Sequence, residues 1–123
     1  MKATVVKRTS LDSAHYLPNY VGKCRSLHGH HWVVEVGVTG EIAPDGMVLD
    51  FKLLSEFLRG VEAQFDHSLI NRVIEIPTAE NIALYIRDRF YSWADALEVT
   101  LEFVRIWETE DSYVEVKGEK EEL

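Results

Sequence analysis

A histidine-rich segment, His28-Gly29-His30-His31, offers the clearest metal-binding chemistry in this sequence. In an extended chain, residues two apart point the same way, so His28 and His30 can present their imidazoles side by side. Gly29 between them lets the backbone lie close to whatever they hold. Paired imidazoles suit zinc, whereas calcium and magnesium prefer oxygen ligands. We therefore expect a zinc site, the alternative being two surface or hydrogen-bonded histidines on a strand.

The third expected zinc ligand is His15. Catalytic zinc usually has three protein ligands and one open position for water or substrate. His15 follows the first predicted strand, and the loop after it can return it beside His28. His31 points to the opposite face of its strand and is left out of the ligand set.

Cys24 is the only cysteine of the chain, so an internal disulfide is excluded. A lone cysteine is more often a small core residue than a catalytic group. This one, however, lies in a polar segment between Lys23 and Arg25, whose charges favour the thiolate. A thiolate near a metal-held substrate could act as a base or as a nucleophile.

Three further side chains are candidates for proton transfer or ligand binding. Asp66 and His67 end the first predicted helix, and an aspartate that orients a histidine is a common acid–base pair. The alternative is a histidine that only stabilises the helix dipole. Glu108 follows a predicted strand and could bind amide and amine donors of a ligand. Alone, it is one of many carboxylates in an acidic chain.

The elements that must position these residues follow from periodicity and capping signals. A helix is predicted from Phe51 behind the cap Asp50, with Leu54, Phe57, Leu58, Val61 and Phe65 on its apolar face. A second opens at Pro77-Thr78, with Glu80 in its first turn and Ile82, Tyr85, Ile86, Phe90 and Trp93 as its core stripe. Strands are predicted at residues 2–10, 30–40, 97–107 and 112–117, and a long loop at 16–27.

Two of these strands are predicted to alternate strictly between faces. Along 30–40, His30, Trp32, Val34, Val36 and Val38 share one face. Along 97–107, Leu97, Val99, Leu101, Phe103, Arg105 and Trp107 share a face opposite Val104 and Ile106. The element order β-β-α-α-β-β favours an α+β fold, an antiparallel sheet with both helices on one face.

The length, composition and net charge of the chain exclude several classes of protein. The 123 residues are 46% hydrophobic and fit one domain, residues 1–123, with a solvated tail from about 118; a disordered chain is excluded. The formal charge of −8 argues against nucleic-acid binding by bulk charge. With no apolar run near the ~20 residues of a membrane span and no signal peptide, we expect a cytoplasmic protein. Open sheet edges and three tryptophans indicate oligomerisation.

Taken in order, six motifs resemble the 6-pyruvoyltetrahydropterin synthase / 6-carboxytetrahydropterin synthase family over nearly the whole chain. They are Ser13-Ala14-His15, Cys24-x-x-x-His28-Gly29-His30, Val48-Leu49-Asp50-Phe51, Asp66-His67-x-Leu69-Ile70-Asn71, Pro77-Thr78-x-Glu80-Asn81 and Trp107-Glu108-Thr109. The sequence departs from the family at His31-Trp32, where a small polar residue and Tyr or Phe are common.

The resemblance implies the tunnelling fold, assembled as a homo-hexamer of two stacked trimers with active sites between subunits. It implies 7,8-dihydroneopterin triphosphate as substrate and zinc held by His15, His28 and His30. Cys24 would be the general base, Asp66 and His67 the partner acid–base relay, and Glu108 the anchor of the pterin ring.

The three residues between Cys24 and His28 resemble the carboxy-forming branch, which feeds 7-deazaguanine (queuosine-type) modification of tRNA. The implied reaction turns dihydroneopterin triphosphate and water into 6-carboxy-5,6,7,8-tetrahydropterin, acetaldehyde and triphosphate. Two alternatives stay open: the pyruvoyl-forming branch with the same site, and a non-catalytic module that binds metal or pterin.

Overall fold

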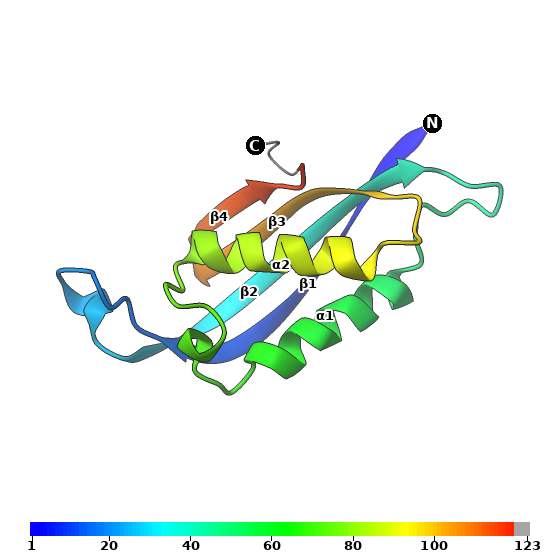
Figure 1. Cartoon of the computed structure of the whole chain (residues 1–123). Helices are drawn as coiled ribbons and strands as arrows, with labels where there is room; N and C mark the ends of the chain where they lie inside the picture. Colours follow the sequence, from blue (N-terminus) through cyan, green and yellow to red (C-terminus); the bar gives the residue numbers. More distant parts are fainter. Residues whose placement is uncertain (120–123) are drawn as a thin grey trace.

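The computed structural model describes residues 1–119 as one antiparallel sheet with two helices packed on one of its faces (Figure 1). The strands β1 (Lys2–His15), β2 (His28–Glu41), β3 (Thr100–Thr109) and β4 (Ser112–Lys117) follow one another across the sheet in chain order. The helices α1 (Phe51–Phe65) and α2 (Ala79–Trp93) lie between β2 and β3 in the sequence. The predicted α+β class, with its β-β-α-α-β-β order, is confirmed.

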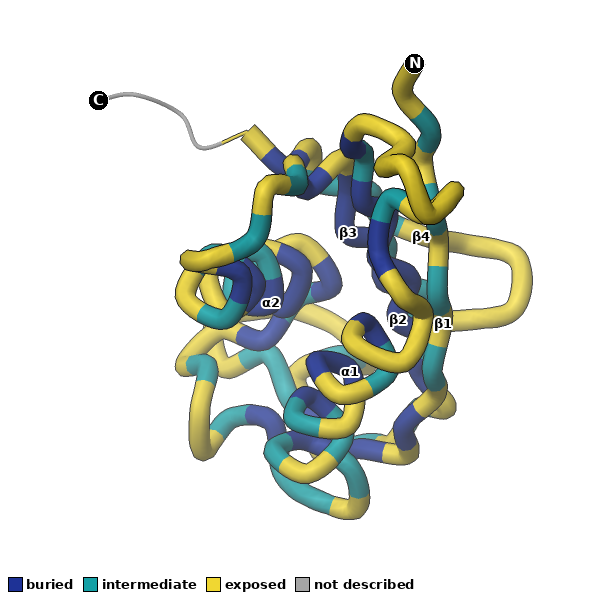
Figure 2. Tube along the Cα trace, turned by 90° about the vertical axis from the view of Figure 1, so that its right-hand side faces the viewer, coloured by how far each residue is buried: buried dark blue, intermediate teal, exposed yellow. Residues whose placement is uncertain are grey.

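The core lies between the sheet and the helices, where buried segments face one another in the end-on view of Figure 2. All five predicted residues of the α1 stripe are buried, and α2 buries Ile82, Ile86 and Phe90. From β2, Trp32 and the valines 34, 36 and 38 fill the other side. No helix within residues 1–119 is long and apolar enough to cross a membrane.

Both helix starts are capped as predicted. The side chain of Asp50 accepts a hydrogen bond from the backbone N–H of Lys52 at 2.9 Å. The hydroxyl of Thr78 accepts the N–H of Asn81 at 3.1 Å, and Glu80 lies in the first turn of α2. Pro77 comes directly before the cap Thr78. Its carbonyl oxygen contacts the ring of His15, so the start of α2 lies against the end of β1.

Two strands are longer than predicted at the ends that matter for the site. β1 continues from Ser10 to His15, and β2 begins at His28 rather than at residue 30. The pairing of the two strands therefore sets His15 opposite His28 and Ser13 opposite His30. A short 3-10 helix, η1 (Lys23–Arg25), interrupts the loop that joins them.

The predicted alternation of β3 is wrong beyond Leu101. Leu101 pairs with Val38 and Phe103 pairs with Gly37, so Glu102 is an extra residue in a β-bulge. Val104 and Ile106 therefore join Leu101 in the core, while Phe103, Arg105 and Trp107 face the helix-free side. β3 also starts at Thr100 rather than at residue 97.

The predicted solvated tail starts later than residue 118. Gly118 is buried, and its N–H donates to the carbonyl of Glu102 at 3.0 Å. Its own carbonyl accepts the hydroxyl of Tyr91 on α2. Glu119 is exposed, and the rest of the predicted tail lies outside the described residues.

Candidate metal centre

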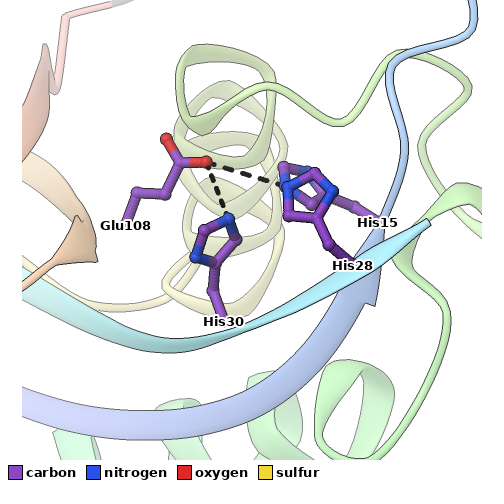
Figure 3. Close-up of side chains that lie close together, drawn as sticks. All are labelled: His15, His28, His30 and Glu108. Atoms are coloured by element: carbon purple, nitrogen blue, oxygen red, sulfur yellow. Dashed lines mark hydrogen bonds and ion pairs between the residues drawn. The ribbon is translucent and has the colours of Figure 1, made fainter. Parts of the chain in front are cut away.

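Three strands bring four side chains together at one end of the sheet (Figure 3). His15 is the last residue of β1, His28 and His30 begin β2, and Glu108 lies near the end of β3. Each offers one nitrogen or oxygen, and these four atoms all lie within 4.8 Å of one another. The predicted convergence of the three histidines is thus present in the structure, and Glu108 joins them.

The imidazoles of His15 and His28 are oriented by backbone carbonyls. His15 Nδ1 lies 2.8 Å from the carbonyl oxygen of Pro77, and His28 Nδ1 lies 2.7 Å from that of Ser26. A carbonyl only accepts, so each Nδ1 carries the proton and each Nε2 keeps its lone pair. Such bonds are the usual outer support of metal-bound histidines.

The lone pairs that result point at one another. His15 Nε2 and His28 Nε2 are 3.0 Å apart, a distance at which two acceptors repel unless a cation or a shared proton lies between them. Two nitrogens at tetrahedral positions on zinc, each at ~2.05 Å, would be about 3.3 Å apart. The observed spacing is close to that value, so the pair fits a zinc ion.

His30 also carries a nitrogen that a metal ion could bind. Its Nε2 is buried and has no hydrogen-bond partner within residues 1–119. Glu108 Oε1 lies 3.1 Å away, but its direction does not make a hydrogen bond. The same oxygen lies 3.6 Å from His15 Nε2. A buried nitrogen without a hydrogen-bond partner costs free energy, and a metal ion bound to it would remove that cost.

Burial keeps the ligand nitrogens free of protons. The pKa of His15 is lowered from its ordinary 6.5, mainly because burial disfavours the charged ring. Burial also lowers the pKa of His30, against the opposing charge of Glu108. Neutral imidazole is the form that binds a metal, so both rings are ready ligands near neutral pH.

Trp32 forms the floor of the centre and was not predicted to do so. Its ring meets those of His15 and His30 edge to face, with centroids 4.9 and 5.2 Å apart, and its indole N–H donates to the carbonyl of Ser13. The indole thus limits the movement of two of the three imidazoles. Alternation along β2 places Trp32 on the side of His30, and that signal was available in the sequence.

His31 is not part of the cluster, as predicted. It lies on the helix-free face, 63% exposed, with Nδ1 2.7 Å from the carboxylate of Asp12. The register of β2 is therefore the one that the alternation of the histidines predicts.

The structure holds Cys24 apart from the cluster of ligand atoms. It lies half-buried in η1, and its carbonyl accepts the N–H of Leu17 at 2.8 Å. Its catalytic role remains a prediction.

Asp66 and His67 follow the end of α1 and are hydrogen-bonded to Asp12 of the edge strand β1. The carboxylate of Asp66 accepts the N–H of Asp12 at 2.9 Å, and the N–H of His67 donates to the carbonyl of Asp12 at 2.7 Å. The two side chains are 3.6 Å apart. His67 has a positive φ of 54° and a side chain that is 80% exposed. This left-handed conformation directly after the C-cap Asp66 is a common way for a helix to end, and it turns the chain toward β1.

His67 and the metal centre border the same surface hollow. An open depression of about 610 Å³ along the β1 edge is lined by both His30 and His67, with Arg72 at its rim. His67 of the predicted acid–base pair therefore borders a space that also reaches His30, although neither His67 nor Asp66 is among the clustered residues.

Comparison with known proteins agrees with this geometry. Residues 4–119 match the family model described as 6-pyruvoyl tetrahydropterin synthase. A protein of Archaeoglobus fulgidus, provisionally named 6-carboxy-5,6,7,8-tetrahydropterin synthase, is 40% identical over 89% of this chain and 90% of its own. The dihydroneopterin monophosphate aldolase of Pyrococcus furiosus is 37% identical over 95% of this chain and 99% of its own.

A solved structure is similar to this chain both in fold and in sequence. The 6-pyruvoyl tetrahydropterin synthase of Caenorhabditis elegans superposes with a TM-score of 0.82 over 97% of each chain, at 26% identity. The fold is therefore the tunnelling fold that the resemblance implied. The chain belongs to the 6-pyruvoyl tetrahydropterin synthase family and is an enzyme of the tetrahydropterin synthase type.

Proposed function

We propose that the protein converts 7,8-dihydroneopterin triphosphate and water into 6-carboxy-5,6,7,8-tetrahydropterin, acetaldehyde and triphosphate, in a zinc-dependent reaction. The observation that carries this proposal is the convergence of three imidazole nitrogens beside a carboxylate. The 40% identical relative supports the carboxy-forming branch. The three-residue spacing between Cys24 and His28 supports the same branch.

In this proposal, His15, His28 and His30 hold the metal. A zinc ion there would supply Lewis-acid chemistry to oxygen atoms of the substrate side chain. The protein contributes the fixed orientation of the ligands, through the carbonyls of Pro77 and Ser26 and the packing of Trp32. Fixed ligands do not have to reorganise when the substrate binds.

Cys24 is proposed as the general base that removes a carbon-bound proton of the substrate. It lies in η1, four residues before the proposed ligand His28. His67 is the proposed partner that returns a proton, and Asp66, 3.6 Å away, orients it.

Glu108 is proposed as the anchor of the pterin ring. Its side chain is 36% exposed, so a ligand can reach the carboxylate from solvent. Two carboxylate oxygens match the adjacent N–H donors on the edge of a pterin, in a bidentate arrangement. The ring would then lie beside the metal centre, with its side chain toward the histidines.

The complete site is proposed to form between subunits of a homo-hexamer. β1 and β4 are the edges of the sheet, so each can pair with a strand of another copy. Cys24 and the pair Asp66–His67 lie outside the cluster of ligand atoms, and a second copy could supply them to it. We further propose a cytoplasmic enzyme that feeds 7-deazaguanine formation.

Product analysis tests this proposal. Zinc-loaded protein is incubated with 7,8-dihydroneopterin triphosphate, and products are identified by mass spectrometry with trapping of aldehydes. Release of acetaldehyde together with a 6-carboxypterin supports the proposal. A 6-pyruvoyl product without aldehyde would assign the protein to the pyruvoyl-forming branch, and no product at all would indicate a binding module.

A second candidate function is aldol cleavage of a phosphorylated dihydroneopterin. The observation that favours it is the 37% identity to an archaeal dihydroneopterin monophosphate aldolase, which extends over 95% of this chain. Cleavage between the first two side-chain carbons would release glycolaldehyde phosphate and leave a 6-hydroxymethyl pterin. The same mass-spectrometric assay, repeated with the monophosphate as substrate, distinguishes these products from acetaldehyde and the 6-carboxypterin.

A further inference from the structure

A buried carboxylate lies on the sheet face that has no helices. Glu35 on β2 has a side chain that is only 8% exposed, although its residue type is rarely buried. Three cations or N–H donors surround it. Trp107 Nε1 donates to its Oε1 at 2.6 Å, Arg8 donates to the same oxygen at 2.5 Å, and Arg105 lies 3.6 Å from its Oε2.

Burying a charge in this way seldom stabilises a fold more than an apolar side chain of the same volume would. The buried carboxylate instead fixes the orientation of the side chains that donate to it. Trp107 is the donor of interest, because it comes directly before Glu108. The Glu35–Trp107 bond therefore links the helix-free face to the end of β3 that carries the proposed pterin anchor.

The backbone at Glu108 needs such support. Trp107 pairs with Val33 on one side and Tyr113 on the other, but the register shifts before Thr109 pairs with Ser112. Glu108 has no partner in either ladder, so it is the extra residue of a bulge. Trp107 is the last residue of β3 held by β2, and its side chain limits how the bulge can turn.

Trp107 and Glu108 also line one cavity. A depression of about 610 Å³ on this side of the sheet is bounded by both residues, together with Arg8 and His31. A shift of the indole would change this wall and the position of the adjacent carboxylate at the same time.

We propose that Glu35 is a positioning residue for ligand binding: through Trp107 it fixes the bulge that presents the Glu108 carboxylate to a pterin ring. This inference rests on the proposed function for the identity of the ligand. Glu35 itself does not touch the ligand, so its effect passes through the indole.

The test is a double-mutant cycle on the dissociation constant of neopterin, measured with the zinc-loaded protein by calorimetry. Glu35→Gln keeps the shape of the side chain and removes its charge, and Trp107→Phe removes the indole donor. Glu35→Gln replaces a charged acceptor by the weaker amide oxygen, and Trp107→Phe removes the donor altogether, so each single variant should weaken binding by up to about tenfold. In the Trp107→Phe background, Glu35→Gln should add less than about twofold, because the bond is already absent.

Glu115→Gln is the matched control. Glu115 accepts from Arg105 at 2.7 Å and from Lys117 at 2.8 Å, whereas the indole of Trp107 donates to Glu35. This variant should change neopterin affinity less than about twofold. Zinc content, measured by elemental analysis, should stay at the wild-type level in all variants, which separates positioning of Glu108 from damage to the metal centre.

Equal affinity of wild type and Glu35→Gln would overturn the proposal, as would an undiminished Glu35→Gln effect in the Trp107→Phe background. If Glu35→Gln fails to fold, by circular dichroism, unchanged binding by Trp107→Phe alone would overturn it. Wild-type protein that binds zinc but not neopterin would instead refute the ligand class of the proposed function, and this inference with it.

Discussion

Removing one imidazole should remove most of the stabilisation of the protein by zinc. His28 is the best residue to change, because it is only half-buried, whereas His15 is part of the buried interior. His28→Ala therefore removes one of three nitrogen donors with little direct loss of packing. The substitution also removes the hydrogen bond from His28 Nδ1 to the carbonyl of Ser26.

The size of the effect follows from linkage. Metal at a hundred times its dissociation constant stabilises the folded state by about 2.7 kcal/mol. Unfolding a chain of 123 residues gains entropy of roughly 0.26 kcal/mol per kelvin, so the melting temperature should rise by about 10 °C. A hundredfold loss of affinity leaves about 0.4 kcal/mol at the same zinc concentration, or a rise of about 2 °C.

The assay is differential scanning fluorimetry of metal-stripped protein at fixed protein concentration, with and without zinc. His31→Ala is the matched control, because His31 is the neighbouring histidine on the opposite face and pairs with Asp12. It should keep the full zinc-induced rise. A full rise in His28→Ala, or its loss in His31→Ala, would refute the assignment of ligands and the register of β2.

Three other substitutions test separate parts of the account. Cys24→Ala should retain zinc by elemental analysis but lose at least ~10²-fold in turnover, as expected for a missing general base; full activity would exclude that role. Gly37→Ala should destabilise the fold by about 1–3 kcal/mol in urea titration, because its Cβ would lie 2.4 Å from the ring of Phe103; an unchanged midpoint would show that the ring moves freely. Asp50→Ala should cost about 1 kcal/mol by the same measurement, through loss of the α1 cap, whereas Asp50→Ser should recover most of it.

The helices and the histidine-bearing face of the sheet were predictable because their signals are local. Helical spacing of apolar residues identified the buried stripe of α1, and the two caps identified where the helices begin. Strict alternation from His30 to Val38 placed the histidines on the core side of β2, which the structure confirms.

The ends of β1 and the faces of β3 depend on tertiary contacts that periodicity does not show. The strand was predicted to end at residue 10, but Ser13 is buried with its hydroxyl donating to the carbonyl of Phe65, and the strand continues to His15. One extra residue at Glu102 reverses every later face of β3. A bulge leaves no mark in apolar alternation, so a prediction from pattern alone fails there.

Part of the candidate site could likewise be predicted from the sequence, and part could not. His15, His28 and His30 were predictable from strand spacing together with the family motifs, and the structure brings their nitrogens together. The place of Glu108 among them was missed, because a bulge next to Trp107 directs that side chain. The joint action of Cys24, Asp66 and His67 with the metal stays a prediction, which depends on how copies of the chain assemble.

The central claim is that one metal ion is held by three imidazole nitrogens from β1 and β2. Crystals of the zinc-loaded protein, with anomalous scattering recorded on both sides of the zinc edge, measure this directly. The account predicts one zinc peak per chain, about 2.0–2.1 Å from Nε2 of His15, His28 and His30. A zinc peak bound elsewhere, or one with only one or two of these rings within bonding distance, would contradict it.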